Sequence, residues 1–342
     1  MTASKGLVIS MFVVVISAAW TRPAGALPCR TPACNAEVGK DEHGPRDDRP
    51  AGGTCPAQDG ADCPHACPHA TAGTCPAMTQ VTYVEIDKAN KSDPRATCNA
   101  KGESCHVKLV GDLYLPAKAK HAPAIIYNHG SVNPGCDTCD HTPGQPCAIA
   151  AYFVSQGYVV FMPRRRGYPP STGKNQLSSL EDESQDIIDA FKYLEKHQSA
   201  AVDSRKIALL GHSLGGIASI FANEQDFGQV ATISIAGGSE SWCGNDKLHA
   251  RMKKAVLAAQ TPIYFLEAKD DVSTQPTIEL SHDMGLAGKR FQAAIFGPVA
   301  NDDDLAPIHC GSQAHVCFTK DKFQVERWAP SVLEYVQRFG VK

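Results

Sequence analysis

The strongest chemical signal in the chain is the run Gly-His-Ser-Leu-Gly-Gly at positions 211–216. It matches the pattern Gly-x-Ser-x-Gly, with an apolar segment before it and a helical segment after it. A serine on so sharp a turn adopts strained dihedral angles, and the nearby glycines leave room for the backbone to pass. The turn also holds Ser213 at a helix N-terminus, which favours developing negative charge. We therefore predict that Ser213 is a nucleophile; the alternative is a glycine-rich turn with an incidental serine.

A serine hydroxyl is a weak nucleophile, so it needs a base, and the base needs an acid that orients it. With this type of turn, the acid and the histidine follow the serine in that order along the chain. Asp270 and Asp271 come directly after a predicted strand, and His309 and His315 lie in the predicted loop after the last strand. His282 falls inside a predicted helix and is a poorer candidate. The base must be neutral, so we expect activity to rise with pH through the midpoint of an ordinary imidazole, about 6–7.

The segments around these residues alternate between strand and helix patterns. Two early strands are expected at residues 81–86 and 107–115. The later strands are expected at 124–127, 158–162, 207–210, 232–236, 263–267 and 291–296, and the helices at 148–156, 180–197, after 213, and at 247–259, 277–286 and 323–339. This order predicts an α/β fold with a doubly wound, mostly parallel sheet and antiparallel leading strands. One loop and one helix fit between the strands at 232–236 and 263–267, so we expect no large cap domain.

Over residues 107–339 these motifs resemble the α/β-hydrolase superfamily, specifically its dienelactone-hydrolase-like and prolyl-oligopeptidase-like serine hydrolases. Asn-His-Gly at 128–130 looks like the oxyanion-hole turn of that family. The resemblance implies that the backbone N–H groups of Ser131 and Leu214 bind the oxyanion. Dienelactone hydrolases proper use cysteine where this chain has Ser213, so a lactone substrate is not implied.

The resemblance also selects among the acid and base candidates. Ala-Lys-Asp-Asp at 268–271 looks like the small-x-x-Asp turn of the family, which favours Asp271 over Asp270. His-Val-Cys-Phe at 315–318 resembles its His-x-x-Phe loop, which favours His315 over His309.

Pro-Arg-Arg-Arg-Gly-Tyr at 163–168 resembles the arginine-glycine turn of the same family. One of these arginines could hold a substrate carboxylate by a bidentate hydrogen bond. Alternatively, the arginines pin the loop by pairing with acidic side chains such as those at 181–183. We favour the structural pairing, because charge runs mostly serve solvation or local ion pairs.

The N-terminal part differs from the rest. Residues 1–26 are interpreted as a signal peptide, because Lys5 precedes an apolar stretch shorter than the roughly 18–20 residues that span a bilayer. The alternative is an uncleaved signal anchor. Residues 27–80 form a Cys/Pro/Gly-rich segment, either a linker or stapled by disulfides, and residues 81–342 form the predicted hydrolase domain.

All 14 cysteines lie after the predicted cleavage site, which favours disulfides in an oxidising compartment. A bridge between Cys310 and Cys317 is favoured over pairing elsewhere, for instance with Cys243. A disulfide-stapled or flexible linker is favoured over a metal site in the Cys/Pro/Gly-rich segment, so no metal and no cofactor are predicted. The alternative metal ligands are Cys63, His65, Cys67 and His69.

The composition narrows the function further. The net charge is -3, with 43% hydrophobic and 20% charged residues, which is typical of a globular protein and gives no basic footprint for nucleic acid. We expect a secreted or periplasmic serine hydrolase that cleaves carboxylic esters through an acyl-enzyme. We expect its substrate to be a small-molecule or exposed ester, with no stable membrane insertion after signal cleavage. The alternatives are a serine peptidase of the same fold and a metal-binding surface protein with a hydrolase-like scaffold; the sequence leaves the oligomeric state open.

Overall fold

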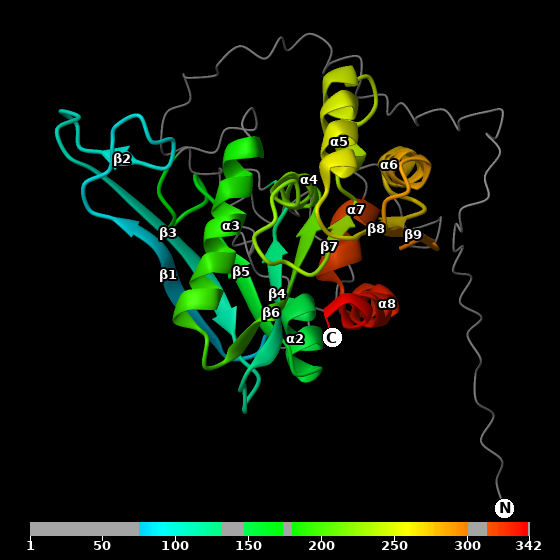
Figure 1. The fold of residues 1–342 in the computed structure, drawn as a ribbon, viewed down its shortest axis with the longest axis horizontal. Helices are drawn as coiled ribbons and strands as arrows, with labels where there is room; N and C mark the ends of the chain where they lie inside the picture. The colour runs from blue at the N-terminus through cyan, green and yellow to red at the C-terminus, as the bar shows by residue number, and fades with distance from the viewer. Residues whose placement is uncertain (1–74, 132–146, 174–179, 300–312, 341–342) are drawn as a thin grey trace, which may run out of the picture.

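The computed structural model describes residues 75–131, 147–173, 180–299 and 313–340 (Figure 1). The predicted signal peptide, most of the cysteine-rich segment with its candidate metal cluster, and His309 lie outside these residues. The division into three parts therefore stays a prediction. Within the described ranges, no helix has both the length and the apolar composition needed to cross a membrane.

A mostly parallel sheet of nine strands forms the centre of the described part of the chain (Figure 1). Its leading strands β1 (Met78–Ile86) and β3 (Cys105–Tyr114) are antiparallel, and the short β2 (Thr97–Cys98) pairs with β3. The parallel strands follow in the spatial order β5 (Val159–Pro163), β4 (Ala122–Asn128), β6 (Val202–His212), β7 (Thr232–Ile235), β8 (Ile263–Ala268) and β9 (Phe291–Phe296). The predicted fold class, including the antiparallel leading strands, is confirmed.

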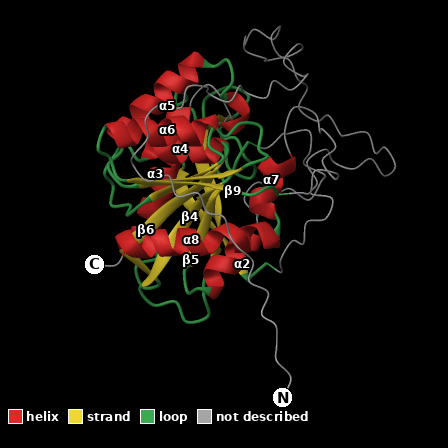
Figure 2. Cartoon of the chain, turned by 90° about the vertical axis from the view of Figure 1, so that its right-hand side faces the viewer, coloured by secondary structure: helices red, strands yellow, loops and turns green. Residues whose placement is uncertain are grey.

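Helices cover both faces of the sheet (Figure 2). One face carries α3 (Leu180–His197), α4 (Leu214–Ala222), α5 (Asp246–Ala258) and α6 (Gln275–Leu286), and the other carries α2 (Cys147–Ser155), α7 (Gln313–Lys320) and α8 (Lys322–Gly340). Because both faces are covered, parallel strands read as continuous apolar runs: every residue of β5, β7 and β8 is buried. The predicted apolar face of α3, with Ile187, Ile188, Phe191 and Leu194, is buried against the sheet.

The strand order determines where a site can form. β4 lies between β5 and β6, so the chain continues to one side after β4 and later returns to the other side. Ligands of open α/β sheets bind outside the carboxyl ends of the strands at such a switch point. The residues that follow β4 and β6, including Ser131 and Ser213, are at this position. Between β7 and β8 the chain forms η2 (Ser239–Ser241) and α5, so the site has no cap domain there, as predicted.

One helix lies where a loop was expected. The sequence predicted a loop around His315, but the structure has α7 there. Ala314, Cys317 and Phe318 are buried at helical spacing. A helix therefore turns these three apolar side chains to the same, inward-facing side. A helix of eight residues is too short for its periodicity to stand out from the sequence.

Disulfides join separate elements. Cys98–Cys105 links β2 to β3, and Cys75–Cys147 links the residues before β1 to the start of α2. Cys243 is also part of a disulfide, and so is Cys317. Cys310 lies outside the described residues, so its bridge to Cys317 stays a prediction.

Candidate active site

Ser213 lies at the sharp turn between β6 and α4, with φ 53° and ψ −121°. A non-glycine residue rarely adopts this conformation, and it persists only where the surroundings fix it. Here the Ser213 N–H donates to the carbonyl of Ile235 at 2.9 Å. A Cβ on Gly211 would clash with the Gly215 backbone, and one on Gly215 would clash with the Asn128 carbonyl. The close approach of these backbones explains the glycines of the motif.

The acid and base candidates meet on the other side of the site. Nδ1 of His315, in the first turn of α7, lies 3.0 Å from both carboxylate oxygens of Asp271, which follows β8. Both side chains are buried. Asp270 points elsewhere, since its carboxylate accepts the Val299 N–H at 3.0 Å. Of the two aspartates, the structure therefore brings Asp271 to His315.

His212 connects this pair to the serine turn. Its Nε2 lies 2.8 Å from the backbone carbonyl of His315, and the two rings are 4.8 Å apart at their centroids. A carbonyl can only accept, so Nε2 of His212 carries a proton and donates it. Burial and the nearby charge of His315 lower the pKa of His212 to about 3, which keeps its ring neutral. Since His212 directly precedes Ser213, this hydrogen bond places the serine turn beside the buried pair.

Asp271 is held as a carboxylate by donors on two sides. Ser239 Oγ donates to its Oδ1 at 2.6 Å, and the Val272 N–H donates to the same oxygen at 2.6 Å. Burial alone would raise the pKa of Asp271, but the charge of His315 and these hydrogen bonds hold it below its ordinary value. Asp271 can therefore orient the imidazole and stabilise its charged form.

A second carboxyl group, that of Glu267, lies against Asp271. Glu267 is the last residue but one of β8, has no exposed surface, and accepts a hydrogen bond from Thr277 Oγ1 at 3.1 Å. Burial and the charge of Asp271 raise the pKa of Glu267 well above its ordinary value. The raised pKa favours the neutral form of Glu267, which can donate a hydrogen bond to Asp271 rather than repel it.

Glu240 lies at the opposite end of the same imidazole. Its Oε2 is 3.7 Å from Nε2 of His315, and its side chain is 37% exposed. Burial alone would lower the pKa of His315, but the charges of Asp271 and Glu240 outweigh this effect and raise the pKa to about 9. The sequence predicted the midpoint of an ordinary imidazole. The difference arises because two carboxylates face one ring.

The candidate oxyanion turn lies directly against the serine. A Cβ on Gly130 would be 3.1 Å from the Cβ of Ser213, so the turn that precedes Ser131 packs against the nucleophile candidate. Leu214 is the first residue of α4, where N–H groups have no partner within the helix. Asn128 Nδ2 donates to Ser219 Oγ at 2.9 Å, which ties this turn to α4.

The three arginines are all held in buried ion pairs: Arg164–Asp112, Arg165–Glu183 and Arg166–Asp186. The structural interpretation of this run is therefore confirmed. Arg165 has a further contact, because its Nη2 donates to the backbone carbonyl of His129 at 2.8 Å. His129 precedes Gly130, so the Arg165 side chain helps to fix the position of the candidate oxyanion turn.

Sequence reasoning missed four of the residues that shape the site: His212, Ser239, Glu240 and Glu267. Glu267 left a signal, since it is a charged residue inside an otherwise apolar strand. Ser239 and Glu240 come shortly after β7, behind Ala236 and two glycines, which places them at the carboxyl edge of the sheet. Their partners are distant in sequence, so the pattern alone did not single them out.

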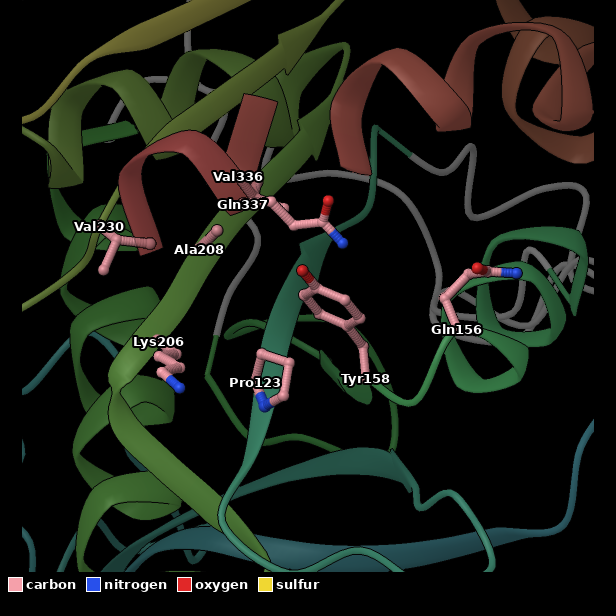
Figure 3. A pocket seen from close by; sticks show the side chains of 8 residues that line it. All are labelled: Pro123, Gln156, Tyr158, Lys206, Ala208, Val230, Val336 and Gln337. Carbon is pink, nitrogen blue, oxygen red and sulfur yellow. The ribbon is translucent and has the colours of Figure 1, made fainter. Parts of the chain in front are cut away.

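A separate pocket of about 210 Å³ lies away from this site (Figure 3). Pro123, at the start of β4, and Lys206, in the first half of β6, form part of its wall. Ser213 follows the other, carboxyl end of β6. The pocket is therefore not part of the candidate active site.

Several known proteins with a similar sequence or structure are hydrolases. A family model described as X-Pro dipeptidyl-peptidase (S15 family) matches residues 102–284, more than half of the chain. The matched range includes Ser213 and Asp271 and ends before His315. The chain is also 33% identical, over 132 residues, to the uncharacterized peptidase YtmA of Bacillus subtilis (strain 168). That match covers 39% of this chain and 47% of the relative, so the chain spans about half the length of the curated relative that it matches.

Many solved structures share the fold, and two of them serve as examples. An acylaminoacyl peptidase of Pyrococcus horikoshii has a TM-score of 0.50 at 16% identity, and the match covers 68% of this chain and 40% of that one. The Pyrococcus furiosus esterase Pf2001 has a TM-score of 0.51 at 14% identity, and the match covers 77% of this chain and 93% of that one. At such identities the likeness shows the α/β-hydrolase fold alone.

These matches confirm the α/β-hydrolase superfamily and do not support the dienelactone-hydrolase part of the resemblance. The matched length of the family model, together with the serine turn and the buried Asp271–His315 pair, identifies the chain as a hydrolase. It belongs to the X-Pro dipeptidyl-peptidase (S15) family.

Proposed function

We propose that this hydrolase cleaves peptide or aminoacyl amide bonds through an acyl-enzyme formed on Ser213. The observation that carries the proposal is the buried Asp271–His315 pair, joined through His212 to the strained serine turn. A serine, a base and an orienting acid are the groups that acyl transfer requires. All of them lie at the carboxyl edge of the sheet.

Each residue has one role in this proposal. Ser213 Oγ attacks the acyl carbon while His315 accepts its proton at Nε2, and the backbone N–H groups of Ser131 and Leu214 bind the oxyanion. Asp271, at Nδ1, stabilises the imidazolium that forms. His315 then gives the proton to the leaving group, the acyl group stays on Ser213, and water releases it by the same steps in reverse order.

The choice of amide substrates is supported by the family and by the Bacillus relative, which is named a peptidase. The described segment between β7 and β8 holds no cap domain, which also fits a peptide substrate. The carboxylic esters expected from the sequence use the same groups and the same acyl-enzyme. They are the second candidate, because the esterase Pf2001 shares the fold over most of its length.

A substrate panel tests the proposal. Aminoacyl and dipeptidyl p-nitroanilides, including X-Pro substrates, are compared with p-nitrophenyl esters of increasing acyl length, each with wild type and Ser213→Ala. Turnover of anilides by wild type and its loss in the variant would support a peptidase. Turnover of esters alone would make the protein an ester hydrolase. If neither class is cleaved and a serine-directed phosphonate does not label Ser213, the proposal is wrong.

We also infer that the protein is exported and that its signal peptide is removed near residue 26. The disulfides Cys75–Cys147 and Cys98–Cys105 support this inference, because such bonds persist in oxidising compartments. Mass spectrometry of the mature N-terminus, together with fractionation, tests it. An intact N-terminus on a protein found in the cytoplasm would contradict export.

A further inference from the structure

A single short turn acts at both ends of the His315 imidazole, through Asp271 at Nδ1 and directly through Glu240 at Nε2. Gly238 has φ 89°, a left-handed conformation that suits glycine, and it starts the 3-10 turn η2. Ser239 on this turn donates to Asp271, which in turn contacts Nδ1 of His315. The next residue, Glu240, faces Nε2 of the same ring. Nothing in the proposed chemistry uses Glu240 so far.

The charges around His315 come from several elements. Asp271 after β8 and Glu240 on η2 each place a carboxyl group close to the ring. The raised pKa of Glu267, at the end of β8, favours its neutral form, and the lowered pKa of His212, at the end of β6, keeps that ring neutral. Lys320, on the same helix as His315, acts on His212 and lowers its pKa. Two carboxylates therefore face one imidazole, a setting that stabilises the protonated ring.

Glu240 thereby opposes the role of His315 as a base. To accept the Ser213 proton, Nε2 must be unprotonated, whereas a carboxylate 3.7 Å away favours a proton on this atom. A substrate cannot change the proton affinity of His315 through Asp271, because the Asp271 side chain is fully buried and hydrogen-bonded. Glu240 is exposed to incoming molecules, and among the described residues no lysine or arginine pairs with it. A substrate cation could therefore form a closer ion pair with Glu240 than the 3.7 Å contact with His315.

We propose that Glu240 binds a cationic side chain, such as that of lysine, on the substrate residue next to the scissile bond. This ion pair draws the Glu240 carboxylate away from Nε2 of His315, so that His315 can act as the base. This inference rests on the proposed function. It names the substrate class as peptides or aminoacyl amides with a cationic side chain next to the bond that is cleaved. Glu240 then determines specificity through both binding and the state of the base.

The test compares two substrates that differ by one charge, the p-nitroanilides of Nα-acetyl-lysine and Nα-acetyl-norleucine. Wild type, Glu240→Gln and the control Glu279→Gln are assayed across pH. Glu279 is a matched control, since it also lies about 4.0 Å from a histidine, His249 on α5, and has a 45% exposed side chain. It belongs to α6, outside the candidate active site.

We expect wild type to prefer the lysine substrate by about tenfold in kcat/KM, which corresponds to about 1.4 kcal/mol, and Glu240→Gln to lose this preference. With the norleucine substrate, the pH midpoint of kcat/KM should fall by about one unit in Glu240→Gln, because one facing carboxylate is removed. Glu279→Gln should match wild type in both measurements.

The inference is overturned if Glu240→Gln keeps the wild-type substrate preference, whatever happens to the pH midpoint. It is also overturned if the preference is lost but the midpoint does not move, because the base would then be independent of Glu240. In both cases, turnover and phosphonate labelling of Ser213 show that the proposed function stands. Absence of labelling and turnover in wild type itself would instead remove the proposed function, and the inference with it.

Discussion

His212 Nε2 donates a hydrogen bond of 2.8 Å to the backbone carbonyl of His315. The bond joins the last residue of β6 to the first turn of α7, two elements separated by about a hundred positions in the chain. It acts on the backbone of His315 and leaves the ring nitrogens of that residue to Asp271 and Glu240. The position of the proposed base relative to the serine turn is thus set by a neutral histidine beside the nucleophile.

Replacing Ser213 with Ala should abolish hydrolysis, with a loss on the order of 10⁴-fold or more in kcat, since residues that act as a unit fail together. The fold should remain, because the turn is fixed by backbone contacts that alanine keeps, such as the hydrogen bond from the N–H of residue 213 to the Ile235 carbonyl. Turnover and labelling by a serine-directed phosphonate are the measurements. Near-normal turnover of the variant, or a label on another residue, would show that Ser213 is not the nucleophile.

The pH dependence should report the charges around His315. The base works only when neutral, and a raised pKa extends the protonated range upward, so the rising limb of kcat/KM moves to higher pH. With an uncharged substrate, its midpoint should lie above that of an ordinary imidazole, toward about 9. His315→Ala should remove the limb and most activity, whereas His309→Ala should be mild. A midpoint of about 6–7 in wild type would contradict the effect of the two carboxylates.

The two neighbouring aspartates offer a matched comparison. Asp271→Asn should lower kcat far more than Asp270→Asn, because Asp271 contacts the imidazole and Asp270 accepts the backbone N–H of Val299. Both changes keep the side-chain shape and remove one charge. Equal losses in kcat would mean that the charge near the site matters and the contact with His315 does not.

Glu267 should tolerate loss of its titratable group. Glu267→Gln keeps a neutral donor beside Asp271, so kcat and the pH midpoint should stay close to wild type. Glu267→Leu removes the donor and should cost about tenfold in kcat, the equivalent of one hydrogen bond of about 1.4 kcal/mol. A shift of the pH midpoint in Glu267→Gln would show that Glu267 is ionised in the native protein.

Arg165 should have two roles that variants can separate: it stabilises the fold by pairing with Glu183, and it positions the turn at His129. Arg165→Met leaves Glu183 buried without its partner and should lower the free energy of unfolding by about 3–5 kcal/mol. Adding Glu183→Leu removes the unpaired charge and should restore most of this stability. The His129 carbonyl still lacks its donor in the double variant, so kcat should remain low. Urea unfolding and kcat measure the two roles; full kcat in the stable double variant would limit Arg165 to stability.

The residues of the serine turn and the order of strands and helices could be predicted from the sequence, because both depend on local chemistry. The pattern at 211–216 requires glycines wherever backbones meet closely, and the apolar runs mark strands buried on both faces. The bounds of α3 were predicted correctly, since its apolar face repeats over five turns. The eight residues of α7 gave too short a repeat, so the sequence predicted a loop there.

The tertiary structure alone decided which side chains meet. From the residues alone, Asp270 and Asp271 were equal candidates, since adjacent positions have the same local pattern. The turn after β8 sends them to different partners, His315 and the Val299 N–H. Glu240 and Glu267 left even less trace, because their effect on His315 depends on distance and burial between elements that are far apart in sequence. Electrostatic interactions follow spatial separation and desolvation, and these quantities exist only once the chain has folded.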